Sequence, residues 1–293
     1  HISNELGKTQ AKLQQLDRNK SNFISVAAHE LKTPLTLIEG YTSMMVDVAQ
    51  DSQLVQMNNY LEGVETGIHR LRDIIDDMID VSLIDNNLLT LNFQPVWISH
   101  LFNLLFNELK KTVAERRQTL TIKPFEGSEI MIYADSERLY QALHNVVSNA
   151  IKYTPDKGTI TINGRLLPGF VEIIIADTGI GISPEHQATI FEKFGQLGRT
   201  DLHSSGKTKF KGGGPGLGLP ITRGIIEAHS GTIWVESEGH DEVKLNGSTF
   251  HILLPTRTEP TDPNMTKFFG QFEVDKKELE TDPSGKENPP TNQ

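Results

Sequence analysis

The sequence predicts a long α-helical hairpin, then an α/β sandwich, then a polar tail. Up to about residue 90, apolar residues recur every three or four positions, which is typical of helices. Helical and strand-like segments then follow one another to about residue 256, which indicates a sheet covered by helices. The remaining residues are rich in Pro, Thr, Asp, Glu, Lys and Asn and bury too little apolar surface to offset the entropy of ordering. We therefore expect three regions, 1–90, 91–256 and 257–293.

Length and composition limit the class of protein. A chain of 293 residues with 37% hydrophobic residues is long enough for two folded units. The formal net charge of -10 argues against a nucleic-acid partner, because holding phosphates requires clustered Lys and Arg. Cysteine is absent, which excludes disulfides and thiolate chemistry. No apolar run approaches the roughly 18 to 20 residues of a spanning helix, so we expect the chain as given to be soluble.

The first region reads as two helices. The first runs from Leu13 to about Val48, and we expect Pro34 to kink it rather than stop it. A polar turn at Gln50–Ser52 leads into a second helix with a heptad pattern. The two interleaved series are Leu54, Leu61, Ile68 and Ile75, and Met57, Val64, Leu71 and Met78. Pairing two hairpins into a dimeric four-helix bundle would bury this seam, whereas an intramolecular coiled-coil spacer is the alternative that periodicity leaves open.

The second region mixes helices and strands. We expect helices at 98–115, 136–151, 184–192 and 217–229. We expect strands at 119–124, 130–133, 158–166, 170–177, 231–238 and 247–254, with a turn at Pro168-Gly169. This order predicts one sheet with about three helices.

The first segment with chemical potential surrounds His29. Glu30 can accept the Nδ1 proton of the imidazole and so leave Nε2 as a neutral nucleophile. Thr33 lies one helical turn on, where its hydroxyl could orient a water toward a phosphate carried on His29. A lone histidine on a helix is usually an ordinary surface or core residue, so these neighbours are what suggest a phospho-acceptor.

A second segment lies in the helix expected at 136–151. Asn145 and Asn149 share one helix face, and their amide oxygens suit a Mg²⁺ ion that already carries phosphates. Lys152 can meet phosphates and Tyr153 can stack on a base. The plainer alternative is a helix with two asparagines near its end.

A third segment follows the apolar strand at 170–177. Asp177 stands at the strand end, where a carboxylate can accept a hydrogen bond from an amine such as adenine N6. Gly179 and Gly181 allow the backbone to approach a ligand. Asp-x-Gly also occurs in plain turns.

A fourth segment, residues 212–219, is rich in glycine and opens the last helix. Backbone N–H groups at a helix N-terminus can cradle phosphates, and we assign this role to Gly214, Gly216, Leu217 and Gly218. No Gly-Lys-Ser/Thr follows, so this is not the lysine-bearing phosphate loop. Pro215 lacks an N–H, so one cradle contact is expected to be missing or displaced.

Together the four segments resemble the core of a sensor histidine kinase. Residues 23–35 resemble the phospho-acceptor box of the HisKA class, although Ala28 stands where Ser is common. The other three resemble the N, G1 and G2 boxes of the GHKL (Bergerat) ATPase fold, with Pro215 and Pro220 departing from the G2 pattern. Residues 191–194 resemble the F box, which adds Phe194 to the nucleotide site, and 195–211 would form the lid that carries Lys207, Lys209 and Lys211. The resemblance covers about residues 10–256.

The resemblance implies a function. It implies binding of ATP and Mg²⁺, with Asn149 on the metal, autophosphorylation of His29 in a homodimer, and transfer to an aspartate of a response regulator receiver domain, often with phosphatase activity. It also implies that a sensor region precedes the chain, which starts at His1 rather than Met. We expect this fragment to be cytoplasmic, while the sequence leaves open whether the parent protein is membrane-anchored.

Two other functions remain open. An ATPase of the chaperone, topoisomerase or mismatch-repair type usually carries a catalytic Glu in the N box, and this class does not explain residues 23–35. A non-enzymatic adaptor with a degenerate ATP site would be distinguished from a kinase by the absence of phosphorylation.

Overall fold

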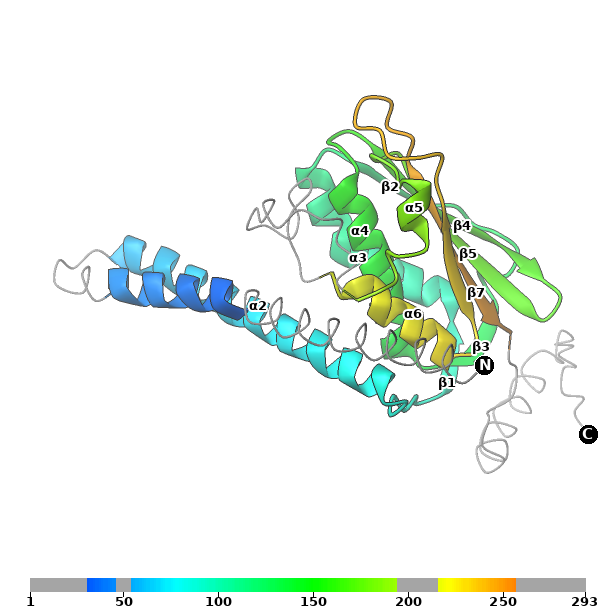
Figure 1. The fold of residues 1–293 in the computed structure, drawn as a ribbon, viewed down its shortest axis with the longest axis horizontal. Coiled ribbons are helices and arrows are strands. Elements are labelled where there is room, and N and C mark those ends of the chain that lie inside the picture. Colours follow the sequence, from blue (N-terminus) through cyan, green and yellow to red (C-terminus); the bar gives the residue numbers. More distant parts are fainter. Residues whose placement is uncertain (1–30, 46–53, 194–215, 257–293) are drawn as a thin grey trace, which may run out of the picture.

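A helical arm projects from an α/β domain in the computed structural model, which describes residues 31–45, 54–193 and 216–256 (Figure 1). Residues 31–45 are helical and pair with α2. The helices after this segment are α2 (Leu54–Asp85), α3 (Ile98–Glu115), α4 (Ser136–Tyr153), α5 (Pro184–Gln187) and α6 (Gly218–Ala228). The strands are β1 (Gln94–Trp97), β2 (Thr119–Ile122), β3 (Met131–Ala134), β4 (Thr159–Leu167), β5 (Phe170–Asp177), β6 (Thr232–Glu236) and β7 (Ser248–Pro255).

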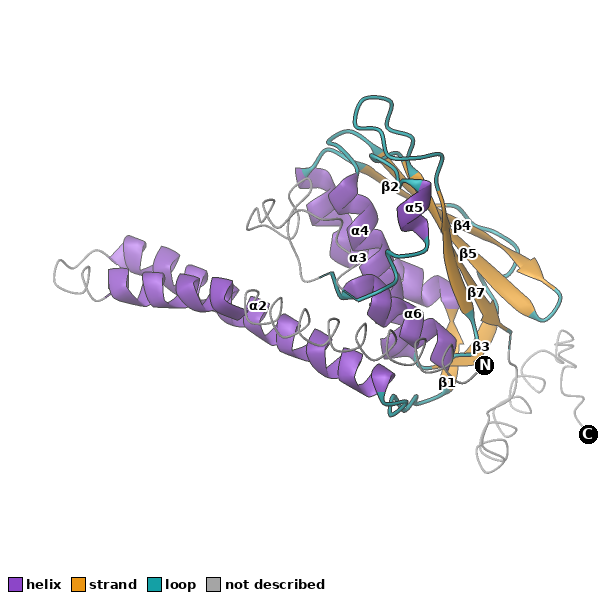
Figure 2. Cartoon of the chain, viewed as in Figure 1, coloured by secondary structure: helices purple, strands orange, loops and turns teal. Residues whose placement is uncertain are grey.

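The main sheet has five strands in the order β2-β4-β5-β7-β6. Only β2 and β4 run parallel among these neighbours, and β4 and β5 form the predicted hairpin, with Leu167 opposite Phe170. Strands β1 and β3 form a separate antiparallel ribbon. Helices α3, α4 and α6 lie together on one side of the main sheet (Figure 2). The predicted hairpin followed by an α/β sandwich is therefore confirmed.

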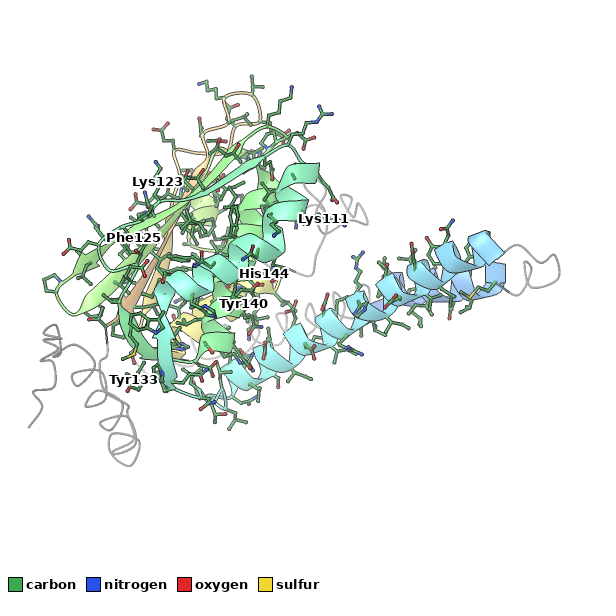
Figure 3. The ribbon with its side chains drawn as sticks, turned by 180° about the vertical axis from the view of Figure 1, so that it is seen from behind. Lys111, Lys123, Phe125, Tyr133, Tyr140 and His144 are labelled. Atoms are coloured by element: carbon green, nitrogen blue, oxygen red, sulfur yellow. The ribbon has the colours of Figure 1, made fainter. Side chains whose placement is uncertain are left out.

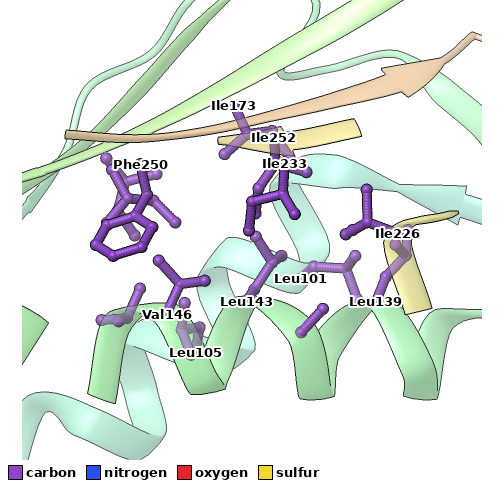
Figure 4. Packing of buried hydrophobic residues seen from close by; sticks show 14 of the residues in the cluster. Leu101, Leu105, Leu139, Leu143, Val146, Ile173, Ile226, Ile233, Phe250 and Ile252 are labelled. Carbon is purple, nitrogen blue, oxygen red and sulfur yellow. The ribbon is translucent and has the colours of Figure 1, made fainter. Parts of the chain in front are cut away.

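The core lies between this sheet and its helices. Leu139, Leu143 and Val146 of α4 point toward strand residues such as Ile173 and Ile252 (Figure 4). Along β7 the side chains alternate strictly between buried and partly exposed, as expected of a sheet with one covered face. Burial of this alternating set fixes the register, because a slip by one residue would turn it to solvent.

The hairpin is packed closely where two glycines of α2 meet the facing helix. A Cβ on Gly67 would lie 2.7 Å from Cγ1 of Ile38, and one on Gly63 would lie 2.4 Å from the Tyr41 ring. The helical segment continues through Pro34, so this proline does not stop it, as predicted. The expected turn at 50–52 and the first helix before residue 31 lie outside the described residues.

One of the two heptad series on α2 faces solvent in the single chain. Leu61, Ile68 and Ile75 are 52%, 45% and 44% exposed, whereas Val64 and Leu71 of the other series are half-buried in the hairpin. A regular row of large apolar side chains on an exposed helix face indicates a further packing surface.

The last two turns of α2 are built into the α/β domain. Val81 is 3% exposed and belongs to its core, and Ile84 packs so closely on α6 that a Cβ at Gly224 would lie 2.6 Å from it. Asp80, also buried, accepts hydrogen bonds from Arg138 and Gln141 of α4 at 2.7 Å and 2.6 Å. The arm is therefore joined directly to the helix that carries the two predicted site asparagines.

Three details differ from the sequence prediction. One sheet was expected, but β3, close to the strand expected at 130–133, pairs with β1 in a separate sheet. Strand β1 was not predicted, because Pro95 argues against a strand interior; it is accommodated because β1 pairs with β3 alone. The helix expected at 184–192 ends at Gln187, whose amide donates to the carbonyls of Ile182 and Ser237, and the chain then turns so that Phe191 packs edge-on against Phe250. Among the described residues, no helix is both long enough and apolar enough to cross a membrane.

Candidate functional site

Helix α4 is the frame of the site. Asp135 caps its N-terminus by accepting from the N–H of Arg138 at 3.0 Å, and the N–H of Asp135 donates to Nε2 of the buried His229. One face packs on the sheet and a second meets α3, where Tyr140 and His144 lie beside each other (Figure 3) and both contact Glu108. The remaining face, toward α6, carries Asn145 and Asn149.

Asn145 connects α4 to the start of α6. Its Nδ2 donates to the carbonyl oxygen of Gly218 at 3.2 Å, and the Thr222 hydroxyl donates to the same oxygen at 2.8 Å. This orientation turns the Oδ1 of Asn145 away from that carbonyl. Asn149 lies one turn further along the same face and is half-buried.

Lys152 and Tyr153 form the C-terminal end of α4. The Lys152 ammonium lies 4.9 Å from the centre of the Tyr153 ring, and Tyr153 is 36% exposed. The carbonyl of Tyr153 accepts from the N–H of Ile180 at 3.2 Å. This hydrogen bond joins the second and third predicted segments.

Asp177 ends β5 and has an unusual environment for a carboxylate. Burial raises its pKa to about 6, although the backbone N–H groups of Gly179 and Ser248 donate to it and oppose the rise. Ser248 was not predicted, but it lies opposite Asp177 in the pairing of β5 and β7. Its contact with Asp177 depends on the register of β5 and β7, which the sequence does not reveal.

The turn after Asp177 requires glycine. A Cβ on Gly179 would lie 2.5 Å from the carbonyl oxygen of Tyr153, so only a residue without a side chain lets this turn reach α4. Gly181 has φ +72, and a Cβ there would lie 2.1 Å from the carbonyl oxygen of Gly239. The predicted close approach of the backbone at both glycines is thus present, although it is directed at the protein's own chain.

The N-terminus of α6 lies beside Asn145. Gly216 has φ +70, Leu217 is fully buried, and Gly218 begins the helix. Pro220 falls in the first helical turn, where a backbone N–H has no intrahelical acceptor, so proline does not disturb the helix. Its presence leaves Gly218 and Leu219 as the first-turn residues with an N–H to offer a phosphate.

Several predicted residues cannot be placed. His29, Glu30, Phe194, Gly214, Pro215 and the lysines at 207, 209 and 211 lie outside the described residues. Thr33 is half-buried on the helical segment 31–45. Phe191, at the start of the predicted F box, is in the core, and Lys193 pairs with Asp85 at the end of α2.

The described residues of the predicted site lie on three connected elements. Asn145, Gly218, Tyr153, Gly179 and Asp177 are linked in a chain of contacts through α4, α6 and the turn after β5. Within the described ranges, no group of three or more His, Cys, Asp or Glu side chains is placed to bind a metal ion. The hard amide oxygens of Asn145 and Asn149 nevertheless fit a Mg²⁺ ion that brings phosphate oxygens with it.

Comparisons with known proteins agree with this geometry. Residues 134–258 match the family described as histidine kinase-, DNA gyrase B-, and HSP90-like ATPase, and residues 19–87 match the His Kinase A (phospho-acceptor) domain. The sensor protein DivL of Caulobacter vibrioides is 31% identical over 262 residues, which is 88% of this chain and 31% of DivL. The chain therefore spans about a third of the length of this curated relative.

Solved structures show the same architecture. Full-length ShkA in complex with AMPPNP has a TM-score of 0.57 and 25% identity, over 82% of this chain and 47% of ShkA. The histidine kinase ThkA in complex with the response regulator protein TrrA has a TM-score of 0.56 and 22% identity, over 84% of this chain and 64% of that one. With a phospho-acceptor hairpin in front of an ATPase domain of this type, the chain belongs to the two-component sensor histidine kinases.

Proposed function

We propose that this chain uses ATP to phosphorylate its own His29 and then passes the phosphoryl group to an aspartate of a response regulator. The observation that carries the proposal is that α4 binds both neighbouring segments: Asn145 donates to Gly218 at the start of α6, and the Tyr153 carbonyl accepts from Ile180 in the turn after Asp177. This site stands in a domain of the histidine kinase-like ATPase family, behind a phospho-acceptor hairpin.

Each described side chain has a role that follows from its position. Asp177, which is largely buried at the end of β5, accepts a hydrogen bond from the adenine amine. Tyr153 stacks on the base or ribose, and Lys152, beside it, meets the phosphates as a point charge. The free N–H groups at the start of α6, that of Gly218 among them, would donate to the phosphates of the nucleotide.

Asn149, with Asn145 beside it on the same face of α4, would hold a Mg²⁺ ion together with the phosphates. The ion, when bound, supplies positive charge that offsets the charge of the transferred phosphoryl group. Gly218 fixes the orientation of Asn145 by accepting from its Nδ2, which keeps the opposite edge of the amide available for the ion.

The transfer step is an in-line attack. Nε2 of His29 forms a bond to the γ-phosphorus as the bond from that phosphorus to the bridging oxygen breaks, and ADP leaves. Glu30 holds the proton on Nδ1 so that Nε2 keeps its lone pair. Thr33, four residues along the sequence from His29, would orient a water that hydrolyses the phosphohistidine and releases phosphate.

The exposed heptad series supports a homodimer. Leu61, Ile68 and Ile75 recur at seven-residue intervals and remain at 44% to 52% exposure in the single chain. Pairing with the same row on a second copy would make a four-helix bundle and bury all three.

The partner is proposed to be a receiver domain. ThkA, which shares the fold, has been solved in complex with the response regulator protein TrrA. A phosphohistidine needs an acceptor of this kind, and the family carries its phosphoryl groups to a receiver aspartate. We further propose that a sensor region belongs to the parent protein, and that this segment works in the cytoplasm, where ATP is available.

The test is phosphorylation of the purified chain with γ-labelled ATP and Mg²⁺, beside the His29→Gln variant. Phosphohistidine survives alkali and is lost in acid, so label of this stability on the wild type alone supports the proposal. Equal acid-labile label on the variant would place the acceptor elsewhere. Absence of label on both chains, despite nucleotide binding, would favour a non-enzymatic adaptor.

A further inference from the structure

The C-terminal end of α4 accepts several hydrogen bonds from outside the helix. A helix normally leaves its last four carbonyls without an intrahelical donor, and Thr154, which caps α4, is extended rather than a glycine in a turn. The carbonyls of Ile151, Tyr153, Thr154 and Pro155 nevertheless all accept hydrogen bonds. Most of these donors come from two side chains at the corner between α3 and β2.

Arg116 is the first of these side chains. Its Nη2 donates to the carbonyl of Thr154 at 3.0 Å and its Nη1 to that of Ile151 at 3.4 Å. The residue is only 9% exposed, and its carboxylate partner, Asp156, has a side chain that is 64% exposed. The guanidinium also pairs with Asp156 through Nε at 2.6 Å, so its charge lies between that carboxylate and the negative end of the α4 dipole.

Gln118 is the second. Its Nε2 donates to the carbonyls of Thr154 at 2.7 Å, Ile151 at 3.0 Å and Pro155 at 3.4 Å. It is 7% exposed. Three acceptors around one nitrogen fix the orientation of the amide, because the oxygen end could make none of these bonds.

The backbone at this corner is shaped to present both side chains. Helix α3 ends at Arg116, and Arg117 follows with φ +52, the left-handed conformation that closes many helices. The chain therefore reverses sharply, and Arg116 and Gln118, on either side of the reversal, reach the same carbonyls. The N–H of Thr119 then donates to the carbonyl of Gly158, which brings β2 into place beside the loop after α4.

The carbonyls bound by Arg116 and Gln118 lie on either side of Lys152 and Tyr153, the two residues of α4 that we assign to the nucleotide. Lys152 and Tyr153 lie between the acceptors at 151 and 154, and the carbonyl of Tyr153 is bound from the other side by the N–H of Ile180. The end of α4 is thus held between the α3–β2 corner and the turn that carries Asp177. Movement of this end would change the distance between Tyr153 and Asp177.

We propose that Arg116 and Gln118 are positioning residues for the nucleotide, which hold Lys152 and Tyr153 at the distance from Asp177 that an adenine nucleotide requires. The inference rests on the proposed ATP site. It adds the two residues that set the distance between the end of α4 and Asp177. Neither side chain touches the nucleotide in this account. Their contribution is to affinity, because they fix the site before the ligand arrives.

The experiment compares Arg116→Met and Gln118→Glu with wild type, by calorimetric titration with Mg²⁺ and a non-hydrolysable ATP analogue at a temperature where all chains are folded. Arg116→Met keeps the apolar stem and removes every donor, and Gln118→Glu keeps the shape and turns the donor into an acceptor. We expect each to bind roughly tenfold more weakly, the size of effect of one charge-assisted hydrogen bond. Asp156→Asn, which removes only the exposed partner of Arg116, should bind as wild type does.

Two further measurements separate positioning from general stabilisation. Arg116→Lys should recover part of the affinity, and the KM for ATP should rise in Arg116→Met while the rate at saturating ATP stays within about twofold. In a Tyr153→Leu background the Arg116→Met change should have little further effect, because the residue acts through that end of α4. The amide of Ile180 should exchange hydrogen faster in Arg116→Met, since its acceptor is the Tyr153 carbonyl.

The outcomes are distinguishable. Wild type that fails to bind the analogue would overturn the proposed function, and with it this inference. Wild type that binds, with Arg116→Met and Gln118→Glu binding equally well and only their melting temperatures lowered, would overturn the positioning role alone. An equal loss from Arg116→Met in the wild-type and Tyr153→Leu backgrounds would also contradict it.

Discussion

Arg138 donates from Nη1 to Oδ1 of Asp80 at 2.7 Å, and this contact joins the helical arm to the first turn of α4. Asp80 is 6% exposed and also accepts from Gln141 at 2.6 Å. The buried carboxylate of Asp80 is therefore hydrogen-bonded by two side chains of α4 instead of by water. The arm and the ATPase domain consequently share a polar contact inside their common packing surface.

Replacing Asp80 by Ala should lower the free energy of unfolding by about 2–4 kcal/mol, because Arg138 and Gln141 would lose a buried acceptor. Urea denaturation measures the change. Asp85→Ala is the matched control, since Asp85 lies on the same helix and pairs with Lys193 at a site where both side chains are more than a third exposed. Its effect should stay within about 1 kcal/mol, and equal losses from the two variants would show that burial of Asp80 is not the cause.

The ionisation of Asp177 predicts a pH dependence of nucleotide binding. Burial raises its pKa to about 6 from the ordinary value of 3.8, so ionisation costs stability as the pH rises through this interval, and the cost is fully present above about pH 6. In the proposed site the ionised carboxylate accepts from the adenine amine more strongly than the protonated acid does, so affinity should fall as the pH drops below about 6. Calorimetry from neutral to mildly acidic pH measures this, with Asp177→Asn as the control that should bind weakly throughout and show no such step. A wild-type affinity that stays flat across the range would remove Asp177 from the adenine contact.

Gly179→Ala should both destabilise the domain and weaken nucleotide binding. The new Cβ would lie 2.5 Å from the Tyr153 carbonyl oxygen, so the turn after β5 must move away from α4. Gly169→Ala is the control, because Gly169 also lies in a turn, at φ +78, but nothing surrounds its Cβ position within 4 Å. We expect that control to lose about 1 kcal/mol of stability and no affinity. Thermal melts and titrations of both variants check this, and intact binding by Gly179→Ala would refute the close contact.

Ile68→Asp should convert a dimer into a monomer. Ile68 lies in the middle of the exposed heptad row, so a charge there would be buried against a second copy of the row. Leu88→Asp is the control, because Leu88 is 62% exposed and lies beyond the end of α2. Sedimentation velocity distinguishes the two species, and a dimeric Ile68→Asp chain would place the interface elsewhere.

The sequence predicted those parts of the fold that depend on local pattern. The heptads of α2, the apolar run of β5 and the alternating residues of β7 each specify one element by local pattern, and the glycines at 179 and 181 mark a close backbone approach. Strand β1 was missed because Pro95 is unfavourable in a strand unless only one neighbour is present, which depends on the assembled sheet.

The features that depend on long-range contact could not be predicted. Ser248 reaches Asp177 only through the register of β5 and β7, some seventy residues apart along the chain. Arg116 and Gln118 look like ordinary polar residues at a helix end until the fold brings the end of α4 beside them. Likewise, the entry of Val81 into the ATPase core cannot be read from a helical repeat. The division of the chain at residue 90 stays a prediction.

The most direct test of the central claim is to locate the phosphoryl group. Wild type, His29→Gln and Asp177→Asn would each be incubated with γ-labelled ATP and Mg²⁺, digested at alkaline pH, and mapped for the labelled peptide. Label confined to the wild-type peptide that contains His29, with none on either variant, is the predicted result, because the acceptor and the adenine site are both required. Label on the same peptide in Asp177→Asn at the wild-type rate, or on another peptide in His29→Gln, would contradict the account.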